Sequence, residues 1–438
     1  MGSPTLGFMN RHRRERRHRS SGGRRLASIG GLIGTSLLVF GVLQISTALP
    51  AGAVTLGAYV VTSNADTPGT CPAGGPCTLR QAITSYNADT PGSVGSASDS
   101  ITFASGLTGT ISLTGILAFT NPSGLNLTIT GNGAPSTIVS QTAASGVFIM
   151  NVATTGAVTI SSLTAQNGTA AGNGGGIDNF GNLTLSSVTV QNSSAGGSGG
   201  GIFNEATGQL TANNVTVTHN TAVSLGGGIV NNNGGTVNAT GLTVTLNSAS
   251  GGAGGGIWNA GTFSATGVNI ASNSAAGANL GGGIFNNNGT LTLGTSTIAG
   301  GTIATNTAAS GGGIYNSNLV AHNPTTLDGV TVSGNIATGN FGGGIANFGP
   351  LTVAFGSSIT GNTAPAGGGG LYNNFNLGGV GPSLNAVTIS GNKSANGGGI
   401  YDDSGGGGLT VTGGSITSNT SSGNGGGVEI APALASAE

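Results

Sequence analysis

Between residues 174 and 430 the chain repeats one arrangement, in which three glycines precede a branched aliphatic residue. Ten copies follow one another at steps of 25 to 31 residues. The aliphatic positions are Ile177, Ile202, Ile229, Ile257, Ile284, Ile314, Ile345, Leu371, Ile400 and Val428. A period of roughly 20–50 residues is typical of solenoids, propellers and repeat arrays.

Two further apolar segments lie between successive glycine triplets, and both alternate apolar with polar residues. Leu183-Thr-Leu185 is an example of the first segment and Val215-Thr-Val217-Thr of the second. Because this alternation and β-branched residues favour strands, we predict three short strands and three corners per repeat. One repeat cannot bury its apolar side chains alone, whereas stacked repeats enclose them in a tube. The predicted fold is therefore all-β, a parallel β-helix over residues 101–430 with about ten regular coils after a few irregular ones.

Asparagine also recurs in phase with the repeat, which a flexible glycine-rich linker would not maintain. One asparagine stands two residues after the aliphatic position, at Asn179, Asn204, Asn231, Asn259, Asn286, Asn316, Asn347 and Asn373, with Asp402 in the ninth place. Another precedes each triplet, at Asn167, Asn192, Asn220, Asn247, Asn273, Asn306, Asn335, Asn362, Asn392 and Asn419. Stacked asparagines form amide ladders and tolerate left-handed backbone, so we predict two structural ladders at the corners.

The N-terminal segment 1–53 differs in charge from the rest. Eight of the ten Lys and Arg residues lie in Arg11–Arg25, and beyond residue 53 two cations face ten acids. An uncharged segment, Leu26–Leu49, follows the basic one and leads to the small residues Ala51-Gly-Ala53. This order predicts an export signal cleaved after Ala53, with an uncleaved membrane anchor as the alternative. The acidic balance of the remainder disfavours nucleic-acid binding.

Residues 54–100 are predicted to cap the solenoid. Cys71 and Cys77 are the only cysteines, and in an exported protein their spacing indicates one local disulfide. Thr78 and Gln81 form a capping box for a short amphipathic helix. Its apolar face consists of Leu79, Ala82, Ile83 and Tyr86. A helix over the first coil would cover an open edge that could otherwise recruit other chains. A short tail, 431–438, ends the chain.

Two segments resemble known families. Cys77–Asn87, which reads CTLRQAITSYN, resembles the motif of the CSLREAI-domain family of exported β-helix proteins. Ile389–Asn392, followed by Gly397–Ile400, is similar to the paired G-G-A-I and F-x-x-N elements of polymorphic outer-membrane proteins. These resemblances imply a right-handed parallel β-helix that is secreted or displayed at the cell surface. They imply no particular activity, although some polymorphic outer-membrane proteins are adhesins.

Few residues offer catalytic chemistry. A hydrolase needs two carboxylates, and the best candidates are Asp402 and Asp403, with Glu429 one coil further on. A solvated turn or a calcium site would account for the same acids. A lyase needs a basic side chain, and the repeat body has only Lys393. We expect no catalytic site and no cofactor, with calcium as the weak alternative.

Two surfaces are candidates for binding. The residue after each aliphatic position should face outward, and it is aromatic at Phe203, Trp258, Phe285, Tyr315, Tyr372 and Tyr401. This row would either hold sugar rings or simply stabilise the sheet by stacking. The second surface presents Thr/Ser pairs such as Thr216 and Thr218, whose array resembles an ice-binding face but also suits an ordinary strand.

The function predicted from the sequence is a non-catalytic adhesin or surface-interaction protein. Its expected partners are polysaccharide or a host or cell-surface protein, with membrane contact only through the signal segment. A carbohydrate-active enzyme on the same fold and a structural surface rod without a specific ligand are the alternatives.

Overall fold

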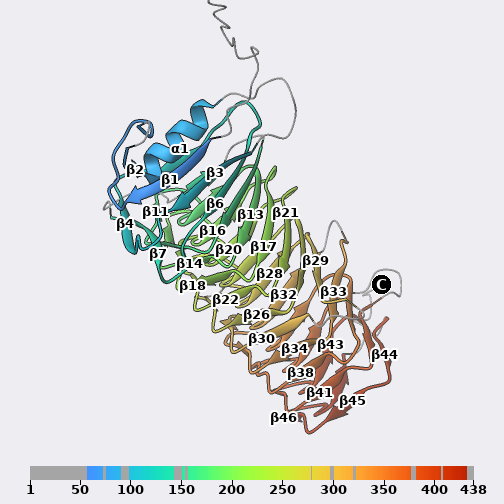
Figure 1. The fold of residues 1–438 in the computed structure, drawn as a ribbon. Helices are drawn as coiled ribbons and strands as arrows, with labels where there is room; N and C mark the ends of the chain where they lie inside the picture. The colour runs from blue at the N-terminus through green and yellow to red at the C-terminus, as the bar shows by residue number, and fades with distance from the viewer. Residues whose placement is uncertain are drawn as a thin grey trace, which may run out of the picture. The chain divides into compact units, whose positions relative to one another are not determined.

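The computed structural model describes residues 57–72, 75–89, 98–142, 150–152, 156–277, 279–295, 300–318, 322–375, 381–405 and 408–431. The predicted signal, its cleavage site and the tail from residue 432 lie outside this range. The described residues form a parallel β-helix of about 11 turns, which confirms the predicted fold class (Figure 1). No helix in the described ranges is long and apolar enough to span a membrane.

Most regular coils contribute four strands, one to each of four sheets, and not the three strands predicted. Sheet A contains, in spatial order, β2 (Cys77–Thr78), β1 (Ala58–Ser63), β3 (Ser98–Phe103), β6 (Asn126–Thr130), β9 (Ala157–Ser161), β13 (Asn182–Ser186), β17 (Gln209–Asn213), β21 (Thr236–Thr240), β25 (Thr262–Thr266), β29 (Thr290–Leu293), β33 (Thr325–Asp328), β37 (Leu351–Ala354), β40 (Ser383–Asn385) and β44 (Thr410–Thr412). Sheet B contains β4 (Gly109–Leu113), β7 (Thr137–Gln141), β10 (Thr164–Gln166), β14 (Thr189–Gln191), β18 (Thr216–Thr218), β22 (Thr243–Thr245), β26 (Val268–Ala271), β30 (Gly301–Ala304), β34 (Val330–Ser333), β38 (Ser358–Thr360), β41 (Thr388–Ser390) and β45 (Ser415–Thr417).

Sheet C carries the strands that begin at the repeated aliphatic residue. It contains β5 (Leu117–Phe119), β8 (Met150–Val152), β12 (Ile177–Asn179), β16 (Ile202–Asn204), β20 (Ile229–Asn231), β24 (Ile257–Asn259), β28 (Ile284–Asn287), β32 (Ile314–Ser317), β36 (Ile345–Asn347), β39 (Leu371–Asn373), β43 (Ile400–Asp402) and β47 (Val428–Ile430). Sheet D is the one the sequence did not predict, because its two-residue strands are too short to show alternation. It contains β11 (Thr169–Ala170), β15 (Ser194–Ala195), β19 (Thr221–Ala222), β23 (Ser248–Ala249), β27 (Ser274–Ala275), β31 (Thr307–Ala308) and β35 (Ile336–Ala337), with β42 (Lys393–Ser394) and β46 (Thr420–Ser421) further along.

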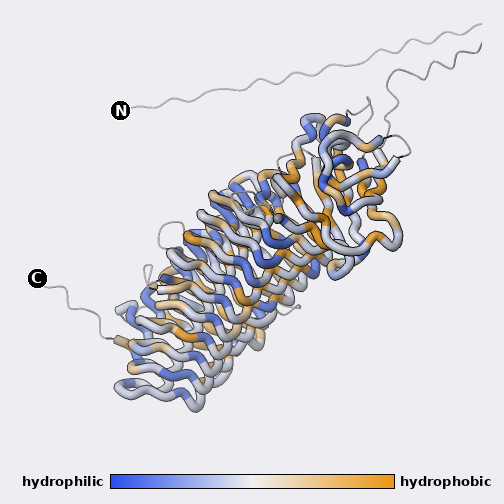
Figure 2. Tube along the Cα trace, turned by 90° about the vertical axis from the view of Figure 1, so that its left-hand side faces the viewer, coloured by the Kyte–Doolittle hydropathy of each residue, from blue (hydrophilic) through white to orange (hydrophobic). Residues whose placement is uncertain are grey.

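Equivalent residues of successive coils lie next to each other. Ile177 pairs with Ile202, which pairs with Ile229, and the same register continues through sheet C. Because the register is constant, each residue type forms a column along the stack, and hydrophilic columns are visible from the side (Figure 2). The inward columns are aliphatic and form one buried core along the solenoid.

The glycine triplets are required at the corner before sheet C. Gly311 has a positive φ of 62°, which glycine adopts without steric cost. A Cβ on Gly312 would lie 2.6 Å from the backbone of Ile336, and one on Gly313 would lie 2.6 Å from the carbonyl oxygen of Gly344. The first glycine therefore supplies a left-handed turn, and the other two allow neighbouring coils to approach closely.

The N-terminal end is capped as predicted. Helix α1 (Leu79–Ala88) has the capping box of Thr78 and Gln81, and its predicted apolar face is buried. Cys71 and Cys77 form the predicted disulfide.

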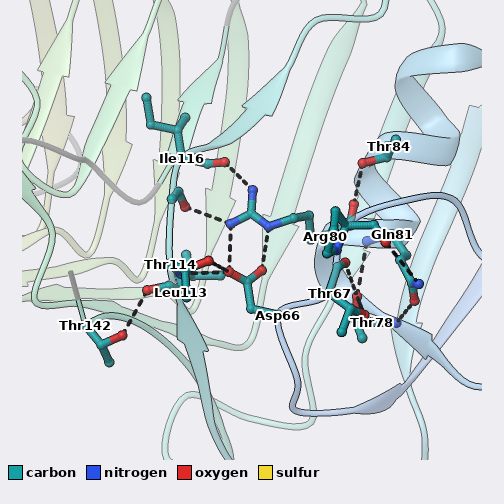
Figure 3. Close-up of polar contacts among 12 residues, drawn as sticks. Asp66, Thr67, Thr78, Arg80, Gln81, Thr84, Leu113, Thr114, Ile116 and Thr142 are labelled. Atoms are coloured by element: carbon teal, nitrogen blue, oxygen red, sulfur yellow. Dashed lines mark hydrogen bonds and ion pairs between the residues drawn. The ribbon is translucent and has the colours of Figure 1, made fainter.

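Arg80 joins the cap to the first coil (Figure 3). Its guanidinium binds both carboxylate oxygens of Asp66, at 2.6 and 3.0 Å, and donates to the carbonyl oxygens of Gly115 and Ile116. Burial acts to raise the pKa of Asp66, but hydrogen bonds from Arg80 and Thr114 outweigh it, so that this pKa is lowered. The cap is thus held by an ionised pair and not only by apolar contact.

Candidate functional site

The asparagines of sheet C form the predicted ladder, which we call the Asn179 ladder. Each side-chain Nδ2 donates to the Oδ1 of the next coil, over 2.7–3.2 Å, from Asn179 to Asn373. The final acceptor is Asp402, at 2.9 Å from Asn373. These asparagines are fully buried, so the ladder is part of the interior and not a binding surface.

A second ladder, the Asn220 ladder, runs from Asn220 to Asn419. Each Oδ1 accepts from both the backbone N–H and the Nδ2 of the asparagine one coil earlier, and each Nδ2 also donates to a backbone carbonyl. The amides are thereby saturated, which explains why asparagine recurs at this corner.

The prediction was wrong for Asn192, because the ladder begins one coil later. The backbone N–H of Ser193 donates to Asn220, so Ser193 occupies the ladder position of its coil. Asn192 precedes it, is exposed and has a φ of 53°; Asn167 has the same conformation one coil earlier. This column requires left-handed backbone, which asparagine tolerates better than most residues. Both columns therefore favour asparagine. Because they are adjacent in the sequence, the analysis treated the asparagines of the two columns as one ladder.

The aromatic row is less exposed than predicted. Phe203, Phe285 and Tyr372 are buried, although they lie outside the central core of the tube, and Trp258, Tyr315 and Tyr401 are half-buried. The corner backbone covers part of the row, since the first glycine of each triplet packs against the residue after the aliphatic position. These side chains point away from the core of the tube, but they are not freely accessible to solvent.

Four rings of this row, together with Phe348, form a continuous chain of ring contacts across successive coils. Ring centroids are 5.3 Å apart for Phe285 and Tyr315, and 5.1 Å for Tyr315 and Phe348. Tilted contacts, with interplanar angles of 49° and 36°, continue the chain of rings to Tyr372 at 5.6 Å and to Tyr401 at 5.8 Å. The faces of Phe285, Tyr315 and Phe348 are directed at one another, and Tyr372 stacks on Phe341 at 4.4 Å, so sugar rings have little access to these faces. The geometry favours the stabilising role of the row over the ligand-binding one.

Phe348 completes this stack and was not identified from the sequence. In its coil the aromatic column is occupied by Ala346, which is fully buried. Phe348 follows two residues later, and its ring takes the place that Ala346 leaves. Two residues along a strand lie on the same face, so a search for aromatic residues two positions away would have found it.

The two candidate catalytic carboxylates lie in different surroundings. Asp402 is 1% exposed and accepts hydrogen bonds from Asn373 and from Ser404 Oγ at 2.6 Å. Asp403 is half-buried and accepts a hydrogen bond of 2.8 Å from the Tyr372 hydroxyl. Glu429 is in register with Tyr401 and not with Asp402. Asp402 is therefore not accessible to a polysaccharide in this conformation.

The hydroxyl of Tyr372 is hydrogen-bonded to the side chains of Asp403 and Asn374. Asn374 donates to its hydroxyl and to Asp403. Burial and the hydrogen bond to Asp403 raise the pKa of Tyr372 above its usual range, so that the phenol stays protonated. The arrangement holds Asp403 as a structural acceptor.

A metal site needs several ligating side chains close together. Within the described ranges, no group of three or more His, Cys, Asp or Glu residues is placed to hold a metal ion. Asp178, which follows the repeated aliphatic residue Ile177, is 7% exposed. Burial, together with the Glu205 carboxylate, raises the pKa of Asp178 to about 7. A neutral Asp178 is the form that this environment favours.

Sheet B presents an accessible surface of uncharged polar side chains. In most of its strands a buried aliphatic residue is flanked by two half-exposed polar ones, as in Thr216-Val217-Thr218. The hydroxyls of neighbouring coils bond to each other, for example Thr245 to Thr218 at 3.1 Å. None of its twelve strands contains an ionisable side chain.

Comparisons with protein-family models, curated proteins and solved structures find no match to this chain.

Proposed function

We propose that this chain is an exported, non-catalytic surface-interaction protein, resembling an adhesin, which binds neutral polysaccharide along sheet B. The resemblance of its cap motif to exported β-helix proteins supports export. The observation that carries the binding proposal is the uncharged face of twelve parallel strands, most of which present Thr or Ser.

A regular hydroxyl array suits an extended neutral polymer. Hydroxyl columns repeat along the solenoid about every 4.8 Å, and the two columns of one strand are about 6.5–7 Å apart. Each hydrogen bond contributes only about 1 kcal/mol, but a polymer that contacts several coils gains from effective concentration at every further contact. The absence of charge on these strands removes the large desolvation cost that ionised groups would add.

The enzyme alternative has less support. A glycosidase needs two carboxylates beside its substrate. Asp402 is buried at the end of the Asn179 ladder, and Asp403 is hydrogen-bonded to Tyr372. Both acids therefore have structural partners that a catalytic role does not require.

The test is retention of the full chain on immobilised neutral, acidic and basic polysaccharides, with supernatants assayed for released sugar ends. The binding variant replaces three sheet B threonines by valine, which removes hydroxyls but keeps strand propensity: Thr216→Val, Thr243→Val and Thr331→Val. The matched control makes the same change on sheet A, where the chosen threonines are also half-buried: Thr184→Val, Thr211→Val and Thr292→Val.

Retention on neutral polymers without sugar release is expected, with loss in the sheet B variant and no loss in the control. Equal loss in both variants would refute sheet B as the site. Release of sugar ends would refute the non-catalytic proposal and direct attention to Asp403→Asn. Failure to bind any polymer in the panel would refute the polysaccharide proposal and leave a protein ligand or the structural rod as the better explanation.

A further inference from the structure

One inward position of sheet A holds a carboxylate where the following coils hold apolar side chains. Asp99 lies in β3 on the same face as Ile101 and Phe103, and it is 1% exposed. Its partner in the next strand is Leu127, which pairs with Val158. The column then continues through Leu183, Leu210, Val237, Phe263 and Leu291. Asp99 therefore departs from the repeat at a core position near the N-terminal end of the solenoid.

The two carboxylate oxygens of Asp99 have different surroundings. Its Oδ1 accepts a hydrogen bond of 2.8 Å from the backbone N–H of Gly57. Its Oδ2 is buried and has no hydrogen-bond partner within the described residues. An ionised carboxylate that is buried without a partner is costly, so this environment requires either a proton or a cation at Oδ2.

Two further oxygen-bearing side chains lie beside Asp99. The Tyr59 hydroxyl donates to Oδ2 of Asp89, and a Cβ on Gly57 would lie 2.5 Å from the same hydroxyl oxygen. The carboxyl groups of Asp89 and Asp99 are close enough for a hydrogen bond if one of them is protonated. Burial and the neighbouring Asp89 carboxylate raise the pKa of Asp99 to about 6, although the Gly57 hydrogen bond opposes this shift. The oxygens converge where β1, β3 and the end of α1 meet (Figure 1).

The chain offers no cationic side chain to this pair within the described residues. Beyond residue 53, Arg80 and Lys393 are the only Lys and Arg residues. The Arg80 guanidinium is bound to Asp66, and it projects from the first turn of α1. Asp89 follows the last residue of this helix, about 13 Å further along its axis. Lys393 lies in β42, towards the other end of the solenoid.

We propose that Asp89, Asp99 and Tyr59 form a binding site for a hard divalent cation, with calcium as the preferred ion. Calcium takes about six to eight oxygen ligands in flexible geometry, so water can complete a shell begun by two carboxylates and a phenol oxygen. Magnesium demands a stricter octahedral arrangement. A cation here would join the end of α1 to β1 and β3, as the Arg80–Asp66 pair joins its beginning to the first coil. The inference does not depend on the proposed ligand of sheet B.

Terbium(III), a luminescent substitute for calcium, tests the site because a tyrosine beside the ion sensitises its emission. The full chain at neutral pH, excited through tyrosine, should give terbium emission that calcium displaces and magnesium displaces less well. Isothermal titration calorimetry should detect one calcium per chain, with a dissociation constant of about 10⁻⁴–10⁻³ M for a site with few protein ligands.

Two substitutions of Asp99 separate binding from folding. Asp99→Leu restores the apolar column, and Asp99→Asn keeps an acceptor for the N–H of Gly57. Both should weaken calcium binding at least about tenfold, because each removes a charged ligand. Tyr59→Phe should lose most of the terbium emission. Asp328→Asn is the matched control, since Asp328 is a half-buried acid in a distant strand of sheet A. Circular dichroism establishes that each variant is folded.

Three results would overturn the proposal. The first is the absence of calcium-sensitive terbium emission from the wild-type chain, which would indicate that a proton alone neutralises Asp99. The second is a calcium affinity that neither Asp99 variant lowers relative to Asp328→Asn. The third is undiminished emission from Tyr59→Phe, which would place the bound ion elsewhere in the chain.

Discussion

Replacing Asn306 with alanine removes one member of the Asn220 ladder at its centre. Its Nδ2 donates to the Ile270 carbonyl at 2.9 Å and to Asn335 at 3.0 Å. Its Oδ1 accepts from the backbone N–H and the Nδ2 of Asn273, at 2.9 and 3.0 Å. The residue is fully buried, so water does not replace these bonds.

Four hydrogen bonds at roughly 0.5–1.5 kcal/mol each give an expected loss of about 2–6 kcal/mol in the free energy of unfolding. Unfolding entropy is about 2.1 cal/mol/K per residue, or about 0.8 kcal/mol/K for a cooperative unit of roughly 370 residues. The melting temperature should therefore fall by about 3–8 °C. If the coils melt in smaller units, the fall in the first transition is larger.

Thermal melts followed by circular dichroism measure this effect. Asn233→Ala is the control, because Asn233 is exposed and lies outside both ladders. Its expected change is within about 0.5 kcal/mol, as for most surface substitutions. A melting temperature for Asn306→Ala within a degree of the control would show that the amide ladder adds little to stability, and the reasoning from saturated amides would be wrong.

Three further predictions concern stability. Because the pKa of Asp178 is raised to about 7, the stability of the wild type should fall as pH rises from about 4 to 7. Asp178→Asn should remove up to about 4 kcal/mol of this loss. The melting temperatures of the two proteins should therefore be equal near pH 4, and that of the variant should be higher at pH 8. Gly228→Ala should reduce folded yield because its Cβ would lie 2.7 Å from a carbonyl oxygen, whereas Gly427→Ala should leave the circular dichroism spectrum unchanged; equal effects would contradict the close-approach explanation. Cys71→Ser with Cys77→Ser should cost about 2 kcal/mol for a six-residue separation, measured as a lower denaturant midpoint, and no change would show that α1 is held without the disulfide.

The features that repeat in phase were predictable from the sequence. A constant register gives each column one environment, so ten copies of Gly-Gly-Gly-Ile indicate the buried column directly. Asn192 was misplaced because two neighbouring columns favour asparagine for different reasons, one for amide bonding and one for left-handed backbone.

The accessibility of side chains was harder to predict, because it depends on what covers a column. Tyr372 faces out of the tube, yet neighbouring rings and the corner backbone bury it. The ring of Phe348 fills the place that an aromatic residue at position 346 would take. Because the two residues belong to different columns, no single periodic position reveals the ring contact.

The places where the repeat is broken help to choose between a local catalytic site and an extended binding face. A catalytic site needs an irregular constellation, and it should appear where residues depart from the repeat without a structural reason. Ala346 is compensated by Phe348, and Asp402 replaces an asparagine as a ladder acceptor, so both departures are explained by packing and hydrogen bonding. Asp178 and Glu205 remain without such an explanation, but Asp178 is only 7% exposed. An extended ligand instead needs similar chemistry along many coils, and the strands of sheet B are uncharged and mostly present Thr or Ser, although β26 has no hydroxyl residue. If binding follows this regularity, removing two whole coils from the middle of the solenoid should weaken polymer retention without abolishing it, whereas a local site would lose either all of its retention or none.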